Sequence, residues 1–382
     1  MEYKEYCLNL LKKLVAIPSE SQNEEEIARF LYSHLEEIGM DVKLQHVSGN
    51  SYNVIGKIKG EGYRKKSKKL LLGGHIDTVT PSRKWTTNPY SLIEDGDKLY
   101  GLGAGDMKGG LAAQLTAIKM FIDNGLDFAG EIEFVGLADE ERHSIGAYAY
   151  VKEKKKNNDI DFAVFAEPHF NSIIVGATGK ILLKLIVNGK TGHAAIPESG
   201  VNAIDCMAEL LSVFNKEYTP LYEKGKIGSF SVLQIGNPTK GYSLSIPDLC
   251  YAFLNKQLID KESIDSFINN LEQLYKEHVK RGIFSIEKEI PCYNSYEINN
   301  KERYLLNLLD IIAGLSYKLP DLKVNQSVSD GNIIYDALGI PIILFGPKGI
   351  DIHKENECLL KSTLFTYMEI LEHYLISFYL ES

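Results

Sequence analysis

The amino-acid sequence predicts an α/β protein in which a mixed, largely parallel sheet is flanked by helices, with an α+β ferredoxin-like domain inserted into it. Two observations predict this fold class. Helical and strand-like patterns alternate through the first half of the chain, which is typical of strands connected by helices. Near residue 178 the order becomes strand, helix, strand, strand, helix, strand, which is that of a ferredoxin-like unit.

Apolar periodicity places the elements of the first half. Residues 2–16 and 24–38 carry apolar side chains at helical spacing, and Pro18 and Gly39 end these two helices. The same criteria predict the elements that follow. Strands are expected at 41–47, 53–59, 70–73, 131–137 and 162–165, and helices at 108–124 and 144–156.

The second half begins with "KILLKLIVNG", residues 180–189, which alternates like a half-exposed strand. Further strands are expected at 228–235, 249–258, 284–290 and within "IPIILFGP", and helices at 201–216, 261–281 and 302–313. We therefore predict an outer domain made of residues 1–177 and 291–382, interrupted by an inserted domain, residues 178–290.

Composition excludes several classes of protein. The 382 residues are 44% apolar and 24% charged, as in an average soluble globular protein. A net charge of −9 argues against a nucleic-acid-binding protein. The start of the sequence does not resemble a signal peptide, and no apolar run is long enough to span a membrane. Five scattered cysteines without a CxxC pair predict reduced thiols and a cytoplasmic location.

Polar side chains follow the apolar strands of the outer domain. The segment "LLLGGHIDTV" ends with His75 and Asp77, which share a face because strand residues two apart point to the same side. Asp106 lies in a glycine-rich turn before a helix. Other strand ends carry Asp139, Glu140, Glu141, Glu167 and His353. Ligands of parallel sheets bind beyond the carboxyl ends of the strands, and two histidines with several carboxylates there suit a metal such as zinc.

Each of these signals has a structural alternative when it is taken alone. A histidine after a strand is often a hydrogen-bonded structural residue, and adjacent acids such as Glu140 and Glu141 also stabilise helix starts. The turn around Asp106 superficially resembles a phosphate loop, but it lacks the GxxxxGK[ST] spacing, and its carboxylate would repel phosphate. The occurrence of candidate ligands at five strand ends together favours a metal site.

Seven segments carry a family resemblance. They are "GGHIDTV", "GAGDMKGG", "ADEE", "AEP", "GKTGHAAIP", "SDGN" and "FGP…IH…NE". In this order they resemble the motifs of the metallopeptidase family that contains acetylornithine deacetylase, succinyl-diaminopimelate desuccinylase and glutamate carboxypeptidases. The resemblance extends from about residue 70 to residue 357. It implies a zinc-peptidase-like outer, catalytic domain and an inserted domain that acts as a lid and as the dimerisation element.

The resemblance also implies the metal ligands. One metal would be held by His75 and Glu167, the other by Glu141 and His353, and Asp106 would bridge them. The implied cofactors are two divalent cations, with zinc first and cobalt or manganese as alternatives. A charge count agrees, because the charges of two divalent cations, three carboxylates and one bridging hydroxide cancel. Without metal, three crowded carboxylates would repel one another and take up protons.

By the same resemblance, Glu140 is the general base, which takes a proton from the metal-bridging water that attacks an amide carbonyl and passes it to the leaving amine. Asp77 is expected to orient the His75 ring, with a strand-end cap as the alternative. His193 of the inserted domain is expected to polarise the carbonyl in the neighbouring subunit, with a turn histidine before Pro197 as the alternative.

Three further residues fall where relatives line the substrate pocket; they are Ser329, Gly331 and Asn332. Relatives also have a cis peptide bond after the bridging aspartate, so we expect one between Asp106 and Met107.

The resemblance fails at the substrate carboxylate. Many relatives hold it with an asparagine and an arginine, where this chain has Leu244 and Gln257, and often have an arginine where this chain has Thr178. Loss of a bidentate guanidinium is not a conservative change. The substrate therefore lacks a free α-carboxylate there, or a lysine such as Lys180 or Lys256 binds it.

The predicted function is cleavage of an amide bond in a small N-acyl amino acid or short peptide, of the deacylase or carboxypeptidase type. One alternative is a di- or tripeptide aminopeptidase of the same family, and a second is a non-catalytic ligand-binding relative. The expected partners are a small-molecule or short-peptide substrate and a second copy of the chain, bound through the inserted domain. Neither nucleic acid nor a membrane is expected as a partner.

Overall fold

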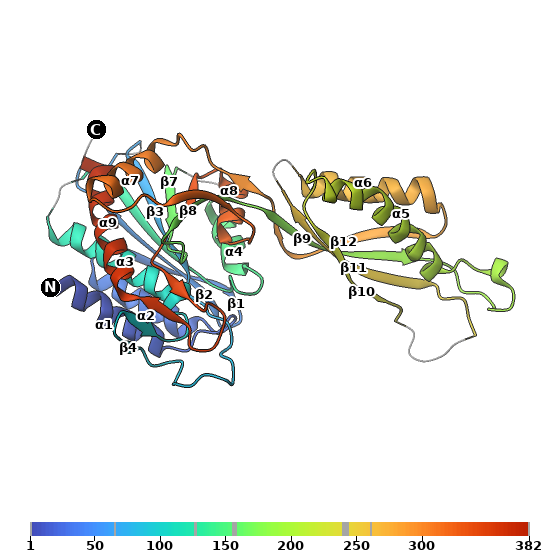
Figure 1. Ribbon diagram of the computed structural model, residues 1–382, viewed down its shortest axis with the longest axis horizontal. Coiled ribbons are helices and arrows are strands. Elements are labelled where there is room, and N and C mark those ends of the chain that lie inside the picture. The colour runs from blue at the N-terminus through green and yellow to red at the C-terminus, as the bar shows by residue number, and fades with distance from the viewer. Residues whose placement is uncertain are drawn as a thin grey trace. The chain divides into compact units, whose positions relative to one another are not determined.

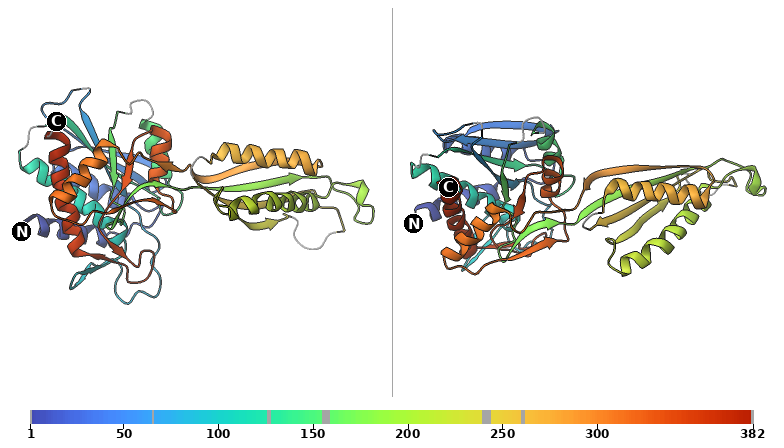
Figure 2. Two further views of the ribbon diagram at one scale, coloured as in Figure 1. Left: turned by 45° about the horizontal axis from the view of Figure 1, so that its top comes forward. Right: turned by 90° about the horizontal axis from the view of Figure 1, so that it is seen from above.

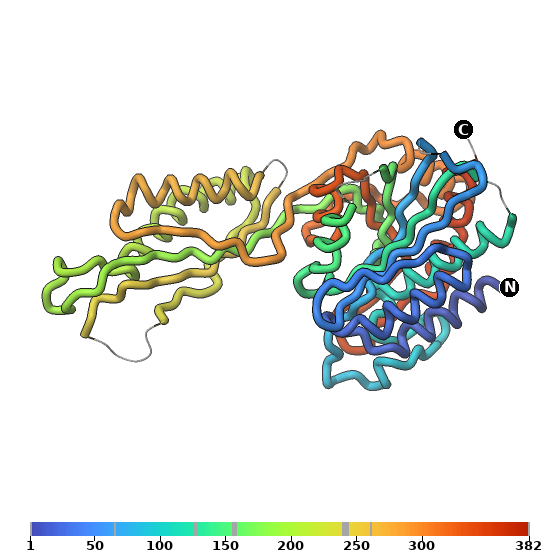
Figure 3. Tube along the Cα trace, turned by 180° about the vertical axis from the view of Figure 1, so that it is seen from behind, coloured from blue at the N-terminus to red at the C-terminus, as the bar shows by residue number. Residues whose placement is uncertain are grey.

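The computed structural model describes residues 2–64, 66–125, 128–154, 159–238, 244–259 and 262–380 (Figures 1 and 3). The chain forms two compact units. The first comprises Met1–Gly176, Glu297–Asn325 and Ser329–Ser382, and the second comprises Ala177–Tyr296 and Gln326–Val328. The second unit contains the whole of the expected insertion, residues 178–290, and extends beyond it at both ends.

Within the described residues, the first unit contains a nine-stranded sheet in the order β1-β2-β6-β3-β7-β15-β8-β13, with β14 paired to β8. The strands are β1 (Asp41–Ser48), β2 (Ser51–Lys59), β3 (Lys68–His75), β6 (Gly130–Leu137), β7 (Phe162–Phe165), β8 (Ser172–Ala177), β13 (Tyr296–Glu297), β14 (Asp321–Asn325) and β15 (Ile342–Leu344). Strands β6, β3, β7 and β15 are parallel neighbours, and β1, β2 and β8 pair in the antiparallel sense. The predicted mixed, largely parallel sheet is confirmed.

Burial on both faces explains why β7 and the middle of β3 read as unbroken apolar runs, whereas β6 also carries the buried Glu131 and Glu133. Every residue of β6 and β7 is buried. At the end of β3 the chain is so crowded that only glycine fits. A Cβ at Gly73 would lie 1.9 Å from the carbonyl oxygen of Val135, and one at Gly74 would lie 2.0 Å from Cε of Met107. Gly73 therefore permits the close approach of β3 to β6, and Gly74 permits the approach of the end of β3 to Met107 in the Asp106 turn.

Helices flank this sheet (Figures 1 and 2). They are α1 (Glu2–Ala16), α2 (Glu25–Glu37), α3 (Gly109–Asp123), α4 (Ile145–Lys154), α7 (Arg303–Gly314), α8 (Asp330–Leu338) and α9 (Lys361–Leu380). In β2, Gly56 faces Leu35 of α2, whereas the Asn53 amide donates to the carbonyl of Gly146 in α4. Residues three apart in a strand point to opposite faces, so α2 and α4 cover opposite faces of the sheet.

The predicted helices of the outer domain agree with the structure to within a residue or two. The helix predicted at 144–156 includes residues 155 and 156, which lie outside the described residues. Helices α8 and α9 were not predicted. A π-helical turn, η1 (Ala104–Lys108), precedes α3. A small sheet, also not predicted, has the order β16-β17-β5-β4 and consists of β4 (Ile93–Asp95), β5 (Lys98–Tyr100), β16 (Gly349–Ile350) and β17 (Cys358–Leu360).

The second unit has the ferredoxin-like order that the sequence predicts. Its elements are β9 (Gly179–Asn188), α5 (Ala203–Glu223), β10 (Phe230–Gly236), β11 (Leu249–Leu258), α6 (Ile264–Leu274) and β12 (Ile283–Tyr293). The antiparallel sheet has the order β10-β11-β9-β12. Alternate residues of β9 and β11 are buried in a core with α5 and α6. Helix α5 continues past the predicted end at residue 216, and the predicted start of the second helix, residue 261, lies outside the described residues.

No helix in the described ranges combines the length and the apolar character that a transmembrane span requires. The five cysteines are free thiols.

Candidate metal centre

The parallel strands deliver the predicted ligands to one edge of the sheet. His75 is the last residue of β3, Glu141 follows β6, Glu167 follows β7, and His353 follows β15 by way of β16. Asp106 comes from the turn η1 in front of α3. Because β6, β3, β7 and β15 are parallel neighbours, their carboxyl ends lie side by side. The topology thus gathers five side chains that are far apart in the sequence.

Two groups of ligand atoms share Asp106. Its Oδ1 lies 3.0 Å from Nε2 of His75, and its Oδ2 lies 3.3 Å from Nε2 of His353. The same His353 nitrogen lies 2.8 Å from Oε1 of Glu141. Ligand atoms of His75, Asp106 and Glu167 lie within 4.8 Å of one another, as do those of Asp106, Glu141 and His353. The structure therefore brings all five predicted ligands together.

The charges of this cluster fit divalent cations. Burial, and then the charge of Asp106, raises the pKa of Glu167 to about 8. Hydrogen bonds to Asp106 and Glu141 raise the pKa of His353 to about 10. The cation-free cluster thus holds protons that balance its carboxylates, and divalent cations would displace them. Imidazole and carboxylate ligands suit zinc, cobalt and manganese.

Asp77 contacts both the His75 ring, as expected for its predicted orienting role, and the backbone of the glutamate pair. Nδ1 of His75 lies 3.0 Å from the backbone carbonyl oxygen of Asp77 and 3.5 Å from its Oδ1, so the carbonyl is the nearer acceptor and Nε2 faces Asp106. The fully buried Asp77 carboxylate accepts the backbone N–H groups of Glu140 and Glu141, both at 3.1 Å, and the Ser21 hydroxyl at 2.6 Å. It therefore fixes the backbone of the glutamate pair.

We expect Asp77→Asn to lower metal affinity and kcat by about 10–100-fold, because an amide nitrogen cannot accept one of the two N–H groups. Ser21→Ala removes only the hydroxyl donor and is the matched control, with a smaller expected effect. Competition with a chelating dye and steady-state kinetics measure the two quantities. Equal effects of the two variants would contradict the positioning role of Asp77.

Backbone conformation also positions the glutamate pair. Asp139, directly before Glu140, has a φ of 65°, and His353 has a φ of 62°. A left-handed conformation at a residue other than glycine costs about 1–3 kcal/mol and is typical of functional sites. The Asp139 carbonyl accepts the N–H groups of His143 and Ser144, which closes the turn.

The Asp106 turn is held by Glu357, a residue for which the sequence alone predicts no role. Oε1 of this buried carboxylate accepts the N–H groups of Gly105 at 2.9 Å and Asp106 at 3.0 Å. Burial, and then the charge of Asp106, raises the pKa of Glu357 to about 7. The predicted cis peptide bond between Asp106 and Met107 is present. Glu357 ends the motif "FGP…IH…NE", so the family resemblance was the signal that could have identified it.

Lys108 joins the same turn to the end of α1. Its buried ammonium group donates to the carbonyl oxygens of Leu14 and Ile17, both at 2.9 Å. Carbonyl groups at a helix C-terminus attract a cation. Burial lowers the pKa of Lys108 to about 7.

The loop between α1 and α2 is fixed by Glu24. This buried carboxylate accepts the N–H group of Gln22 at 2.7 Å. Burial, and then the charge of Asp77, raises the pKa of Glu24 to about 7 from its ordinary value of 4.5. A carboxyl whose pKa is raised on folding contributes stability that is fully present below the unfolded pKa and is lost as pH rises through the folded pKa.

We therefore expect Glu24→Gln to gain stability relative to the wild type between pH 5 and pH 8, because the glutamine has no charge to bury. Urea unfolding of both proteins at the two pH values measures the difference. Glu26→Gln, at an exposed position of α2, is the control and should show no such change with pH. The same pH dependence in both variants would contradict the assignment.

The three predicted substrate residues form a helix cap. Ser329 is the N-cap of α8; its Oγ accepts the N–H group of Gly331 at 3.2 Å, and Oδ1 of Asn332 accepts the Ser329 N–H group at 3.0 Å. All three residues are buried. Their contact with substrate stays a prediction.

His193 belongs to the second unit, in an exposed loop between β9 and α5. Its ring nitrogen Nδ1 accepts the backbone N–H group of Ala195 at 3.2 Å, and the backbone N–H group of His193 donates to Oγ of Ser199 at 3.1 Å. The loop thus fixes the ring, and the role of His193 in catalysis stays a prediction.

Lys256 is not available as a substitute carboxylate clamp, so that expectation is wrong. It is fully buried in the second unit and donates to the carbonyl oxygens of Gly228 and Gln257 and to Oε1 of Glu262, at 3.1, 2.5 and 2.8 Å. An ammonium group has three N–H donors, and these bonds use all of them. Lys180 is exposed.

Comparison with known proteins gives consistent results. The family model described as peptidase family M20/M25/M40 matches residues 71–377. A succinyl-diaminopimelate desuccinylase of Buchnera aphidicola is 30% identical over 387 residues, which cover 96% of this chain and 97% of the relative. An acetylornithine deacetylase of Aliivibrio fischeri is 27% identical over 386 residues and 97% of each chain.

Solved structures share the fold over nearly the whole chain. A tripeptidase of Staphylococcus aureus has a TM-score of 0.76 at 24% identity, and an aminopeptidase of Bacillus cereus has a TM-score of 0.77 at 20% identity. Each comparison covers 98% of both chains.

Proposed function

We propose that this chain, which belongs to the peptidase family M20/M25/M40, cleaves an amide bond of a small N-acyl amino acid or short peptide at a pair of divalent cations. Membership makes the chain a metal-dependent amide hydrolase. The observation that carries the finer proposal is the position of Asp106, whose two carboxylate oxygens face His75 and His353.

In this proposal His75 and Glu167 would hold one cation, Glu141 and His353 would hold the other, and Asp106 would be a ligand shared by both sites. Zinc is the first candidate, with cobalt or manganese as alternatives. When bound, such cations supply Lewis acidity, which lowers the pKa of water and polarises a carbonyl oxygen.

Glu140 is the proposed general base. Its carboxylate oxygen lies within 4.8 Å of ligand atoms of His75 and Glu141, and burial raises its pKa well above the ordinary value. A raised pKa makes a carboxylate a stronger base toward the attacking water and brings its proton affinity closer to that of a group that works near neutral pH. The same oxygen would deliver that proton to the leaving amine. Asp77 would keep the base in place through the N–H group of Glu140.

The names of the sequence relatives support an N-acyl amino acid as the substrate, since they are a desuccinylase and a deacetylase. A di- or tripeptide aminopeptidase is the second candidate. It is favoured by Leu244 and Gln257, which replace the polar pair that holds an α-carboxylate in many relatives. The relatives known by structure include proteins named as a tripeptidase and an aminopeptidase.

A substrate panel tests the proposal. N-acetyl and N-succinyl amino acids are compared with di- and tripeptides that carry a free amine, using protein loaded with zinc, cobalt or manganese. We expect the N-acyl compounds to be hydrolysed fastest, with activity lost on chelation and recovered on adding metal. Fastest turnover of the free-amine peptides would favour the second candidate, and activity that survives chelation would overturn the proposed metal centre.

We also propose that the second unit is the lid and dimerisation element, and that His193 acts on the carbonyl in the partner subunit. Strand β10 lies at the edge of its sheet, and Leu233 and Ile235 are 62% and 55% exposed there. An exposed apolar edge strand is a template for pairing with another chain. Light scattering is expected to give twice the mass of one chain, and the mass of a single chain would contradict the proposal.

A further inference from the structure

The loop 138–146 carries both the proposed base Glu140 and the proposed ligand Glu141. It connects β6 with α4 and returns on itself, because Gly146 donates its N–H group to the carbonyl oxygen of Ala138 at 3.1 Å. Ala138 and Gly146 therefore form the neck of the loop, where the chain leaves the core and rejoins it. Both residues of the neck are buried.

The side chain of Asn53, in β2, joins the two residues of the neck. Its Oδ1 accepts the N–H group of Ala138 at 3.0 Å, and its Nδ2 donates to the carbonyl oxygen of Gly146 at 2.9 Å. The same nitrogen also donates to Oε1 of Gln45 at 2.7 Å. Asn53 is fully buried, so water cannot replace these bonds when one of them is lost. Both donors and the oxygen of the amide are therefore engaged.

The position of Asn53 in the sheet explains why a side chain closes the neck. The ladder between β2 and β6 ends at Val54, opposite Gly136, so a side-chain oxygen of the next residue of β2 accepts the N–H group of Ala138 where the ladder has ended. The neck is also tightly packed. A Cβ at Gly146 would lie 2.5 Å from the backbone N and O of Ala138 and from Oδ1 of Asn53. Only glycine fits there.

The loop beyond the neck has a strained backbone. Asp139 has a φ of 65° and Ser144 a φ of 50°, which are unusual for residues other than glycine. The carbonyl oxygen of Asp139 accepts the N–H group of Ser144 at 2.6 Å. Such strain persists only where the surrounding structure enforces it. The shape of the loop therefore depends on contacts that hold it from outside.

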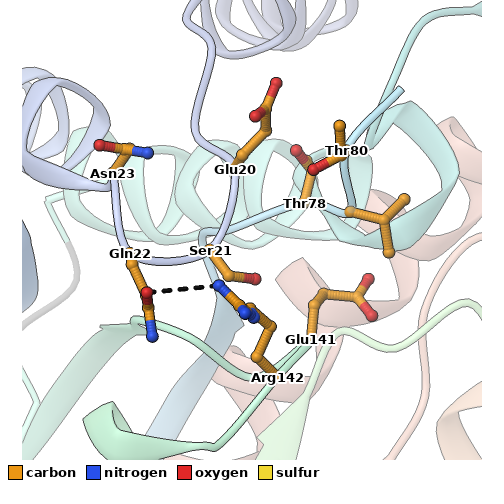
Figure 4. Close-up of a pocket in the computed structure, with 9 residues that line it drawn as sticks. Glu20, Ser21, Gln22, Asn23, Thr78, Thr80, Glu141 and Arg142 are labelled. Atoms are coloured by element: carbon orange, nitrogen blue, oxygen red, sulfur yellow. Dashed lines mark hydrogen bonds between the residues drawn. The ribbon is translucent and has the colours of Figure 1, made fainter. Parts of the chain in front are cut away.

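These outside contacts lie at two places. At the tip, the Asp77 carboxylate holds the backbone of the glutamate pair, and the exposed Arg142 donates to Oε1 of Gln22 at 3.3 Å (Figure 4). At the neck, the contact is the buried amide of Asn53. The loop is thus fixed at its tip and at its neck by side chains from different strands.

We propose that Asn53 is a positioning residue that closes the neck and thereby fixes Glu140 and Glu141 for the metal centre. His75 and Glu167 follow other strands and do not belong to the loop. Opening the neck should therefore weaken the cation site to which Glu141 contributes and spare the other one. This inference rests on the proposed function for the presence of two cations.

Two independent variants open the neck in metal-loaded protein. Asn53→Asp keeps the size of the side chain but places an oxygen against two acceptors, the carbonyl of Gly146 and Oε1 of Gln45. Gly146→Ala places a Cβ where Ala138 and Asn53 already lie. We expect each variant to hold about one cation per chain instead of about two, and to lower kcat by about 10–100-fold.

Two control variants leave the neck intact. Gln45→Met removes the outer acceptor of the Asn53 amide but neither bond to the neck. Gly314→Ala adds a Cβ in α7, where nothing lies within 4 Å. Both controls should hold as many cations as the wild type, and loss of one cation in either would contradict the inference.

Anomalous diffraction from zinc-loaded crystals of Asn53→Asp or Gly146→Ala identifies the cation that is lost. We expect the peak beside His353 to weaken and the peak beside His75 to remain. A residue with a merely structural role would weaken both peaks alike. Equal loss of the two peaks, or no loss of either, would therefore overturn the inference.

Hydrogen exchange of metal-free protein separates this inference from the proposed function, because it requires neither cations nor turnover. Mass spectrometry follows the peptide 138–146. We expect its amides to exchange about tenfold faster or more in Asn53→Asp and Gly146→Ala than in the wild type, with a peptide from α9 unchanged. If the wild type binds no cations while this difference persists, the proposed function fails and the role of Asn53 at the neck stands. Unchanged exchange of the peptide 138–146 would overturn that role.

Discussion

Replacement of Glu140 by glutamine is expected to lower kcat by about 10²–10⁴-fold and to leave the bound metal unchanged. The glutamine side chain has the same shape, but it cannot take a proton from water. The Glu140 backbone would still be held by the Asp77 carboxylate. Single-turnover or steady-state kinetics, with the metal content determined on the same sample, measure both quantities.

Glu141→Gln is the matched control for this prediction, because it changes the neighbouring residue in the same way. Oε1 of Glu141 is 2.8 Å from His353, so this variant should lose metal together with activity. If Glu140→Gln retained most of its kcat, Glu140 would not be the base. If it lost metal as Glu141→Gln does, Glu140 would be a ligand instead.

Replacement of Asp106 by asparagine is expected to remove metal from both sites and to lower activity by at least about 100-fold, since even residues that only support metal ligands cost about 10–100-fold. The reason is geometric. Asp106 contributes to both groups of ligand atoms, whereas Glu167 contributes to one. Metal content per chain after loading and desalting is the measurement.

Glu167→Gln is the comparison, because it should weaken one cation and spare the other. We expect about two cations per chain in the wild type, about one in Glu167→Gln and less than one in Asp106→Asn. Equal metal contents in the two variants would contradict the shared position of Asp106.

The parallel centre of the fold could be predicted from the sequence because β3 and β7 are buried on both faces and contain apolar runs, and because β6 is mostly apolar apart from Glu131 and Glu133. The ligands His75, Glu141 and Glu167 could be predicted because each follows such a run within a few residues, whereas Asp106 and His353 were identified through the family motifs.

Helix α9 was missed although its buried Leu364, Leu371 and Phe378 recur at helical spacing, because apolar residues such as Phe365 and Ile376 also lie outside its buried set and blur the pattern. Helix α8 has only nine residues, and its "SDGN" start was interpreted as a pocket motif rather than a cap.

The supporting contacts of the site were beyond the reach of local patterns. Asp77 and the backbone of Glu140 are 63 residues apart, and Glu357 and the backbone of Gly105 are 252 apart. Only the folded chain shows that these carboxylates accept N–H groups at the site. The same holds for Lys256, whose partly buried partner Glu262 removes it from substrate binding.

We propose that the five side chains gathered at this sheet edge hold two cations on a common aspartate. Anomalous diffraction from zinc-loaded crystals would locate these cations. We predict two peaks about 3.5–4 Å apart with Asp106 between them, one beside His75 and one beside His353. Zinc-loaded crystals with no peak at these side chains would contradict the claim.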